Sequence, residues 1–156
     1  NDYLLDELER AVVDGTRVVM DAMEDGTYVV GGGAVEIEIL MKIREYAQTV
    51  GGRVQMAIEA YAAAYESIPR ALAENSGFDP IDKLVELKNV HAMGSRNAGL
   101  NVYEGKIVDM LSAGVIEPLR SKRQSIQSAS ETAVMLIRVD DMMITQQGGR
   151  SGAPGM

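Results

Sequence analysis

The stretch Gly31-Gly32-Gly33-Ala34-Val35-Glu36-Ile37-Glu38 joins a short apolar segment, Tyr28-Val29-Val30, to the start of a strong helical pattern. Glycine accepts the positive φ angles that let a backbone turn tightly and pass close to a ligand. A helix that begins directly after such a turn points unpaired N–H groups and the positive end of its dipole outward, which favours an anion such as phosphate. A glycine triplet before a helix is more often only a tight turn, so the phosphate interpretation depends on what lies on either side of it.

Helical spacing of apolar residues extends over most of the chain on both sides of this turn. It predicts helices over residues 3–23, 34–50, 53–67, 69–74, 80–92 and 118–145, and a possible strand over residues 100–103. The start at Asp79-Pro80 is well marked, because an N-cap carboxylate precedes a proline at the first helical position. At 1.5 Å per residue the last helix would be roughly 40 Å long. Glu38 and Lys42 are predicted to form an i,i+4 ion pair on the outside of their helix.

Composition excludes several classes of protein. The 156 residues contain no cysteine, so neither a disulfide framework nor a thiolate metal site can form. The net charge of −8 argues against a nucleic-acid surface, which needs a basic patch. No signal peptide and no apolar run long enough to cross a membrane is present. We therefore expect a soluble, cytoplasmic protein with enough apolar residues for one core.

Two titratable residues have more than one interpretation. Asp14 lies near the apolar stripe of the first helix, and on the residues alone a solvated helix carboxylate is favoured. His91 is the only histidine. Its place near the end of a helix predicts a polar surface residue rather than a metal ligand or a base.

A series of short stretches follows in a specific order: residues 9–14, 24–26, 31–38, 44–47, 57–60, 68–75, 79–82, 114–120 and 137–141. In this order they resemble the group II chaperonins, which are the archaeal thermosome and its eukaryotic cytosolic relatives. The resemblance runs from about Leu5 to Thr145. It is to the C-terminal third of a subunit, without the phosphate-binding loop, the magnesium ligands or the apical domain of the family.

The resemblance implies a mainly α fold, a chaperonin equatorial-domain-like helical bundle with a long C-terminal helix and at most a small β-hairpin. Residues 1–26 resemble a helix and hinge of the intermediate domain. Residues 27–145 resemble the C-terminal half of the equatorial ATPase domain. The Gly-rich residues 146–156 resemble a flexible tail.

The resemblance also implies a nucleotide site. Asp14 falls at the catalytic aspartate that positions the water attacking ATP, and Gly31, Gly32 and Gly33 fall where backbone approaches the nucleotide. Asn101 falls near the adenine, and Glu117 falls where a carboxylate accepts hydrogen bonds from the ribose hydroxyls. The implied cofactors are ATP or ADP with Mg²⁺. The Mg²⁺ ligands are expected in the N-terminal part of a subunit, and no metal ligand is expected in this chain.

The implied function is that of a subunit of an ATP-dependent chaperonin, which assists protein folding in a homo- or hetero-oligomeric double ring. Unfolded clients would bind through the apical domain, and neither nucleic acid nor membrane is expected as a partner. The chain alone is expected to have little or no ATPase activity and to associate through exposed apolar faces. The alternative is a stand-alone helical self-association module with a vestigial nucleotide site.

Overall fold

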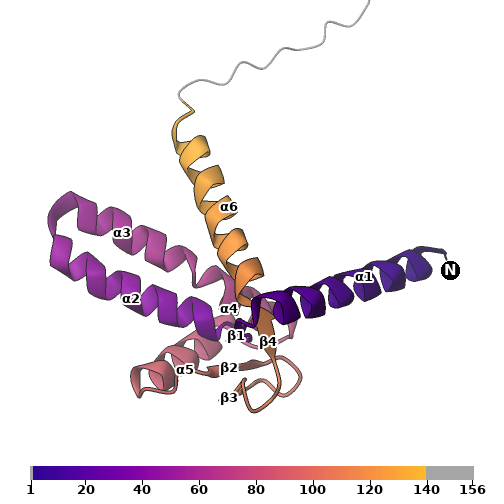
Figure 1. Cartoon of the computed structure of the whole chain (residues 1–156). Coiled ribbons are helices and arrows are strands. Elements are labelled where there is room, and N and C mark those ends of the chain that lie inside the picture. Colours follow the sequence, from indigo (N-terminus) through magenta and orange to yellow (C-terminus); the bar gives the residue numbers. More distant parts are fainter. Residues whose placement is uncertain (1, 140–156) are drawn as a thin grey trace, which may run out of the picture. The chain divides into compact units, whose positions relative to one another are not determined.

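The computed structural model describes residues 2–139, and in this range six helices and four short strands follow one another (Figure 1). The helices are α1 (Asp2–Asp25), α2 (Ala34–Val50), α3 (Gly52–Ala64), α4 (Ser67–Asn75), α5 (Pro80–Ala92) and α6 (Leu119–Ile137). The strands are β1 (Tyr28–Val30), β2 (Ala98–Asn101), β3 (Lys106–Asp109) and β4 (Ile116–Pro118). The chain divides into two compact units after Lys122, and the second unit contains the greater part of α6.

The mainly α prediction is confirmed, and the best-marked helix boundaries are the most accurate. α2 occupies residues 34–50 as predicted, and it begins after Gly33 and ends at Gly51, both with positive φ. α5 begins at Pro80, where the Asp79 side chain accepts hydrogen bonds from the backbone N–H groups of Ile81 and Asp82. Local signals of this kind fix helix ends because they satisfy N–H groups that the helix itself leaves unpaired.

The last helix is shorter than predicted within the described range. α6 ends at Ile137, and the backbone N–H of Arg138 bonds to the carbonyls of Val134 and Met135. No glycine or proline marks this end in the sequence, so the helical pattern alone extends beyond it. The predicted continuation over residues 140–145, and the predicted tail over residues 146–156, lie outside the described residues.

The core of the first unit lies between α2, α5 and the β2–β3 hairpin. Ile37, Leu84 and Leu87 are almost fully buried and pack together, with Met41 and Ile107 against them. α2 and α3 run side by side as a helical hairpin, which Figure 1 shows in purple and magenta. Because Ile37 is in the second turn of α2, this core fixes the end of α2 that follows the glycine turn.

Two antiparallel two-stranded sheets exceed the single small hairpin that was predicted. β2 and β3 form the hairpin, with Ala98 opposite Asp109 and Asn101 opposite Lys106. β1 pairs with β4, which places Val29 opposite Glu117 across a long separation in sequence. Three-residue strands give almost no alternation to detect, which is why this second ladder was not predicted.

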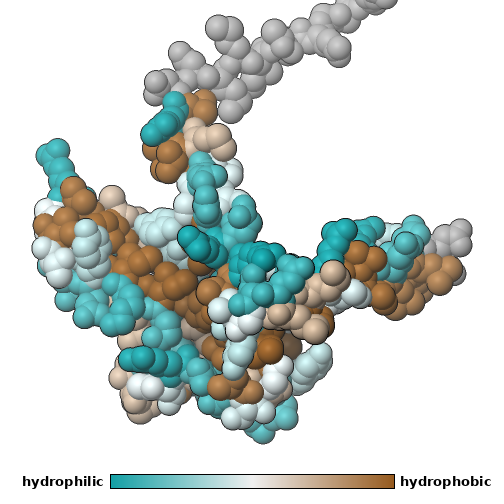
Figure 2. Space-filling model, in the orientation of Figure 1, coloured by the Kyte–Doolittle hydropathy of each residue, from teal (hydrophilic) through white to brown (hydrophobic). Residues whose placement is uncertain are grey.

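Apolar side chains reach the surface of several helices in the described part of the chain, as the brown areas in Figure 2 show. On α1 they recur at helical spacing, and each is more than half exposed: Leu4, Leu8, Val12, Val19 and Met23. Such a stripe is typical of a helix that packs against another protein segment. In residues 2–139 no helix combines the length and the apolar character that crossing a membrane requires.

Candidate functional site

A cavity of about 540 Å³ lies at the start of α2, beside the glycine turn. Gly32, Gly33, Asn101 and Glu117 line it, so four of the predicted nucleotide-site residues come together there. Most of the other lining residues are apolar: Ile68, Leu72, Leu100, Val102, Met110, Ala113 and Val115. A cavity of this size with an apolar wall and a few polar groups is typical of a small-molecule site.

Backbone hydrogen bonds hold the glycine turn between the two sheets. The N–H of Gly31 donates to the carbonyl of Val115 at 3.0 Å, and the N–H of Leu100 donates to the carbonyl of Gly32 at 2.8 Å. These bonds bring residues 31–33, β2 and the start of β4 to one place. The predicted convergence of Gly31, Asn101 and Glu117 thus has a backbone cause.

Close packing accounts for the glycines of this turn. A Cβ atom on Gly32, whose φ is 66°, would lie 2.8 Å from the Cε of Met110 and 3.0 Å from the backbone nitrogen of Leu100. A Cβ on Gly33 would lie 2.9 Å from that of Pro69. The triplet is therefore required by its own neighbours, and it does not by itself indicate a phosphate.

The first turn of α2 already contains a carboxylate, Glu36, which is 2% exposed. Its Oε1 accepts a hydrogen bond from the Nζ of Lys122 at 2.7 Å, and the same Nζ lies 2.8 Å from Oε2 of Glu117. A buried carboxylate near the positive end of a helix dipole satisfies the attraction that would otherwise favour a bound anion. The Lys122–Glu36 pair was missed from the sequence because the two residues are 86 positions apart. Glu36 belongs to the stretch that follows the glycine turn, but nothing local identifies its partner.

Burial and hydrogen bonding have opposite effects on the pKa of Lys122. Burial by itself would lower the pKa of the ammonium, but hydrogen bonds from it to Glu117 and Glu36, together with their negative charges, raise the pKa above its ordinary value. The lysine therefore remains a cation between two carboxylates.

Asn101 ends β2 and shapes the hairpin next to the cavity. Its Oδ1 accepts hydrogen bonds from the backbone N–H groups of Tyr103 at 3.0 Å and Glu104 at 3.3 Å. This is the usual role of an asparagine in a turn. Since Oδ1 is used in this way, it is the side-chain NH₂ group that can offer donors to a ligand in the cavity.

Asp14 does not line the cavity. It lies in the middle of α1, where the side chains are exposed. The predicted catalytic aspartate and the predicted nucleotide-site residues are therefore not brought together in this conformation.

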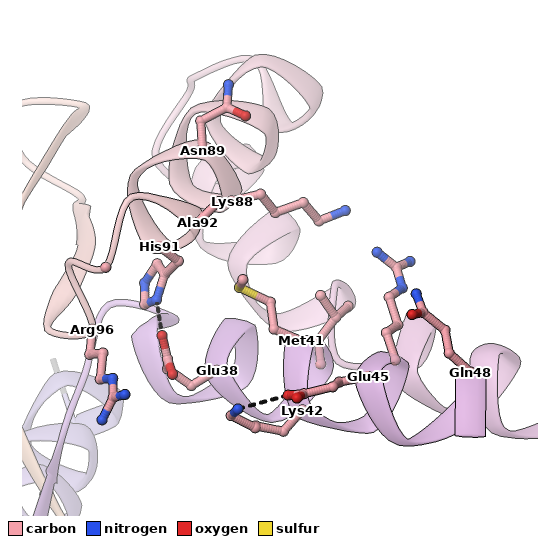
Figure 3. Close-up of a pocket in the computed structure, with 13 residues that line it drawn as sticks. Glu38, Met41, Lys42, Glu45, Gln48, Lys88, Asn89, His91, Ala92 and Arg96 are labelled. Atoms are coloured by element: carbon pink, nitrogen blue, oxygen red, sulfur yellow. Dashed lines mark hydrogen bonds and ion pairs between the residues drawn. The ribbon is translucent and has the colours of Figure 1, made fainter. Parts of the chain in front are cut away.

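A second hollow, of about 590 Å³, lies between α2 and α5, and His91 is among the residues that line it (Figure 3). The prediction that His91 is a surface residue is wrong. The imidazole is fully buried, not on the surface: Nδ1 is 2.7 Å from Oε1 of Glu38, and Nε2 is 2.7 Å from the carbonyl oxygen of Ala98. His91 thus joins α5 to α2 and β2. Leu84 and Leu87 are buried on the same face of α5, so helical spacing does contain the signal for a buried histidine.

The predicted Glu38–Lys42 pair is wrong for the same reason. Glu38 bonds to His91, and Lys42 instead bonds to Glu45 at 2.8 Å, as Figure 3 shows. The local i,i+4 contact is worth only a few tenths of a kcal/mol in an isolated helix, about 0.2–0.5, so a buried partner from another helix easily replaces it.

A buried carboxylate with three cationic partners lies close to this hollow. Glu66 accepts from Lys88 at 2.7 Å, from Arg44 at 2.9 Å and from Arg70 at 3.4 Å. Burial alone would raise the pKa of Glu66, but the hydrogen bond and charge of Lys88 and the charges of the two arginines lower it below its ordinary value. Three elements are joined by this one side chain, since Arg44 is on α2, Arg70 on α4 and Lys88 on α5.

A metal centre has no support among residues 2–139. No group of three or more His, Asp or Glu side chains in that range converges in a way that could hold a metal ion. The described residues therefore do not fit a magnesium site.

Comparisons with known proteins identify relatives along almost the whole chain. Residues 1–147 match the TCP-1/cpn60 chaperonin family. "Thermosome subunit beta" of Thermoplasma acidophilum is 51% identical over 145 residues, covering 93% of this chain and 27% of the relative. "Thermosome subunit beta" of Archaeoglobus fulgidus is 50% identical over 162 residues, covering 99% of this chain and 30% of the relative.

A solved structure has the same fold. It is the open-state monomer of a group II chaperonin from Methanococcoides burtonii, with a TM-score of 0.77 and 50% sequence identity, and the match covers 89% of this chain and 35% of that chain. The chain thus spans less than a third of the length of the two curated relatives. The predicted resemblance is confirmed for both sequence and fold.

Proposed function

Because the chain belongs to the TCP-1/cpn60 chaperonin family, we propose that it is the C-terminal part of an ATP-dependent chaperonin subunit that assists protein folding in a ring. In this proposal residues 1–26 are a helix and hinge of the intermediate domain, and residues 27–145 are the C-terminal half of the equatorial ATPase domain. The relatives of this chain are named as thermosome subunits, which supports the proposal.

The cavity at the start of α2 is the observation that carries the nucleotide part of the proposal. Its apolar wall suits the faces of a base, and Glu117 offers the carboxylate that two vicinal ribose hydroxyls can share. Asn101 can add a donor for the base. Gly32 and Gly33 supply backbone at the cavity wall, and Gly31 lies next to Glu117. This arrangement suits the nucleoside end of ATP or ADP.

The phosphates and Mg²⁺ require other residues. When bound, ATP supplies the phosphoryl group and Mg²⁺ would neutralise its charge, but residues 2–139 offer no cluster that could hold the metal. We assign the binding of the phosphates and Mg²⁺ to those regions of a complete subunit that the longer relatives have and this chain does not match. Little or no ATP hydrolysis is then expected from this chain alone.

Asp14 is proposed to orient the water that attacks the terminal phosphate. Phosphoryl transfer depends mainly on positioning and charge, so a single well-placed carboxylate has a large effect. Because Asp14 is exposed on α1 and does not line the cavity, the proposal requires α1 to move toward the nucleotide. Asp14→Ala should then abolish turnover and leave nucleotide binding intact, whereas Glu117→Gln should weaken binding.

The proposed partners are other chaperonin subunits in a homo- or hetero-oligomeric double ring, and unfolded client proteins bound by an apical domain, all in the cytoplasm. The exposed apolar stripe of α1 favours a second candidate, a helical self-association module whose nucleotide site is vestigial. Both candidates predict association, so association alone does not distinguish them. ATP turnover does.

The decisive experiment measures the mass of the natural particle and ATP turnover on the same sample. A very large ring whose turnover is lost in Asp14→Ala supports the chaperonin proposal and the role of Asp14. A small particle without turnover contradicts it and supports the self-association module.

A further inference from the structure

Lys122 bonds to both acids that line the cavity, the buried Glu36 and the more exposed Glu117. Its Nζ is 2.7 Å from Oε1 of Glu36 and 2.8 Å from Oε2 of Glu117. The exposed fractions of the side chains rise in that order from 2% for Glu36, through 13% for Lys122, to 41% for Glu117. The three residues come from α2, α6 and β4, so the ammonium joins three separate elements at the cavity wall.

The charges of this group do not cancel. One ammonium faces two carboxylates, and Glu36 is too buried to be left without a cation. Lys122 is therefore needed by Glu36, and Glu117 shares it. The remaining negative charge is at Glu117, on the side that ligands can reach.

The two oxygens of Glu117 have different surroundings. Oε2 faces Lys122, whereas Oε1 lies beside Gly31, 3.4 Å from the position that a Cβ atom would take there. A side chain at residue 31 would crowd Oε1, and the ion pair does not use it. The carboxylate is thus held by one oxygen and can accept hydrogen bonds with the other.

We propose that Lys122 is a positioning residue for Glu117, which it holds by Oε2 so that Oε1 accepts a hydrogen bond from a ribose hydroxyl. This inference rests on the proposed function of the cavity as a nucleoside site. It goes further by making ribose specificity depend on Lys122. A Glu117 without Lys122 is free to adopt other rotamers, and the carboxylate then distinguishes ribose from deoxyribose poorly.

The test compares the affinities of ATP and 2′-deoxy-ATP for the protein expressed from its complete gene, in its native assembly. A hydrogen bond to a charged group is lost when the 2′-hydroxyl is removed, so the unmodified protein should prefer ATP about tenfold or more. The main variant replaces both Glu36 and Lys122 by Gln, because the pair of changes leaves no unpaired buried carboxylate. We expect this variant to bind 2′-deoxy-ATP nearly as well as the unmodified protein does, with the preference for ATP reduced to about twofold.

Lys88→Gln is the matched control. Lys88 is also a half-buried lysine bound to a carboxylate, but its partner is Glu66, away from the cavity. Its replacement should leave the preference for ATP unchanged. A role of Lys122 in stability alone would alter both affinities equally and would leave their ratio intact.

The outcomes separate this inference from the proposed function. Absence of ATP binding by the unmodified protein would contradict both. Binding of ATP with the usual preference, retained in full by the Glu36→Gln, Lys122→Gln variant, would overturn the role of Lys122 and leave the nucleotide site standing. Loss of the preference in that variant and not in Lys88→Gln would establish the positioning role.

Discussion

Two cations in the first turn of α6, only two residues apart, pair with carboxylates in very different surroundings. Lys122 is 13% exposed and faces Glu36 and Glu117 at the cavity. Arg120 is 51% exposed and contacts three acids at the end of α1: Asp21 at 3.3 Å, Glu24 at 3.6 Å, and Asp25. More carboxylates meet at Arg120, yet we expect the loss of Lys122 to cost more stability.

The difference lies in what happens when the pair is broken. A surface ion that loses its partner is solvated by water, so exposed pairs contribute little to stability. A buried ion that loses its partner keeps the cost of its lost hydration and has nothing to offset it. The number of ion pairs is therefore a poor guide to stability in this protein, and the burial of the acid is the better guide.

The largest effect is expected from Lys122→Met, which keeps most of the length of the side chain and removes its charge. Glu36 would remain buried without a cation, and the free energy of unfolding should fall by about 3–5 kcal/mol. Urea unfolding followed by circular dichroism measures this. Lys88→Met is the matched control, and its loss should be smaller because Glu66 keeps Arg44 and Arg70.

A double variant sharpens this prediction. If the loss comes from an unpaired buried carboxylate, adding Glu36→Gln to Lys122→Met should restore much of the stability, since neighbouring changes in one ion pair are not additive. Equal losses in Lys122→Met and Lys88→Met would show that the cations left beside Glu66 do not reduce the cost of losing a lysine.

Gly32→Ala tests whether the residues around the cavity are also sensitive to a change that involves no charge. The new Cβ would lie 2.8 Å from Met110 in a backbone conformation with φ of 66°, and the loss in unfolding free energy should be about 1–3 kcal/mol. Gly77→Ala is the control, because Gly77 has φ of 80° but no atom within 4 Å of the new Cβ. A loss as large in Gly77→Ala would mean that backbone strain, and not packing, sets the effect.

The ion pairs of the buried Glu66 should make the stability of the protein depend on pH. Its pKa is lowered in the folded protein from an ordinary value of 4.5, so its contribution to stability is present above that pH and is lost as the pH falls through the folded pKa. Thermal unfolding from pH 7 down to pH 3 should show a steeper decrease below about pH 4.5 for the unmodified protein than for Glu66→Gln. Parallel curves would contradict the assigned role of Glu66.

Features fixed by interactions within a few residues could be predicted from the sequence. The turn at Gly33 and the cap at Asp79 act within a few residues, and α2 and α5 begin where these signals predict. The helical end at Ile137 has no such signal, and it was placed too far along the chain.

Among the site residues, too, contacts between distant parts of the chain were the ones that sequence patterns could not predict. The structure places Gly32, Asn101 and Glu117 around one cavity, and their nucleotide-binding role stays a prediction. The β1–β4 ladder and the Leu100–Gly32 bond that bring them together cannot be recognised from local patterns, so only the resemblance to a family grouped these residues. Lys122 bonds to Glu36 across 86 positions and was missed. The role of Asp14 stays a prediction, since it depends on a movement of α1.

The smallest effect is expected from Arg120→Ala, although this change removes a cation with three acidic partners. All four side chains reach solvent, so the loss of stability should be slight at low salt and should vanish at high salt, where exposed charges are screened. Arg10→Ala is the control, because Arg10 is an exposed arginine with Glu7 as a single partner on its own helix. Unfolding midpoints measured at 0.01 and 1 M salt, where the screening lengths are about 30 and 3 Å, give the comparison directly. A salt-independent loss as large as that of Lys122→Met would mean that the three acids at the end of α1 behave as a buried site, and the distinction drawn between the two cations of α6 would then be wrong.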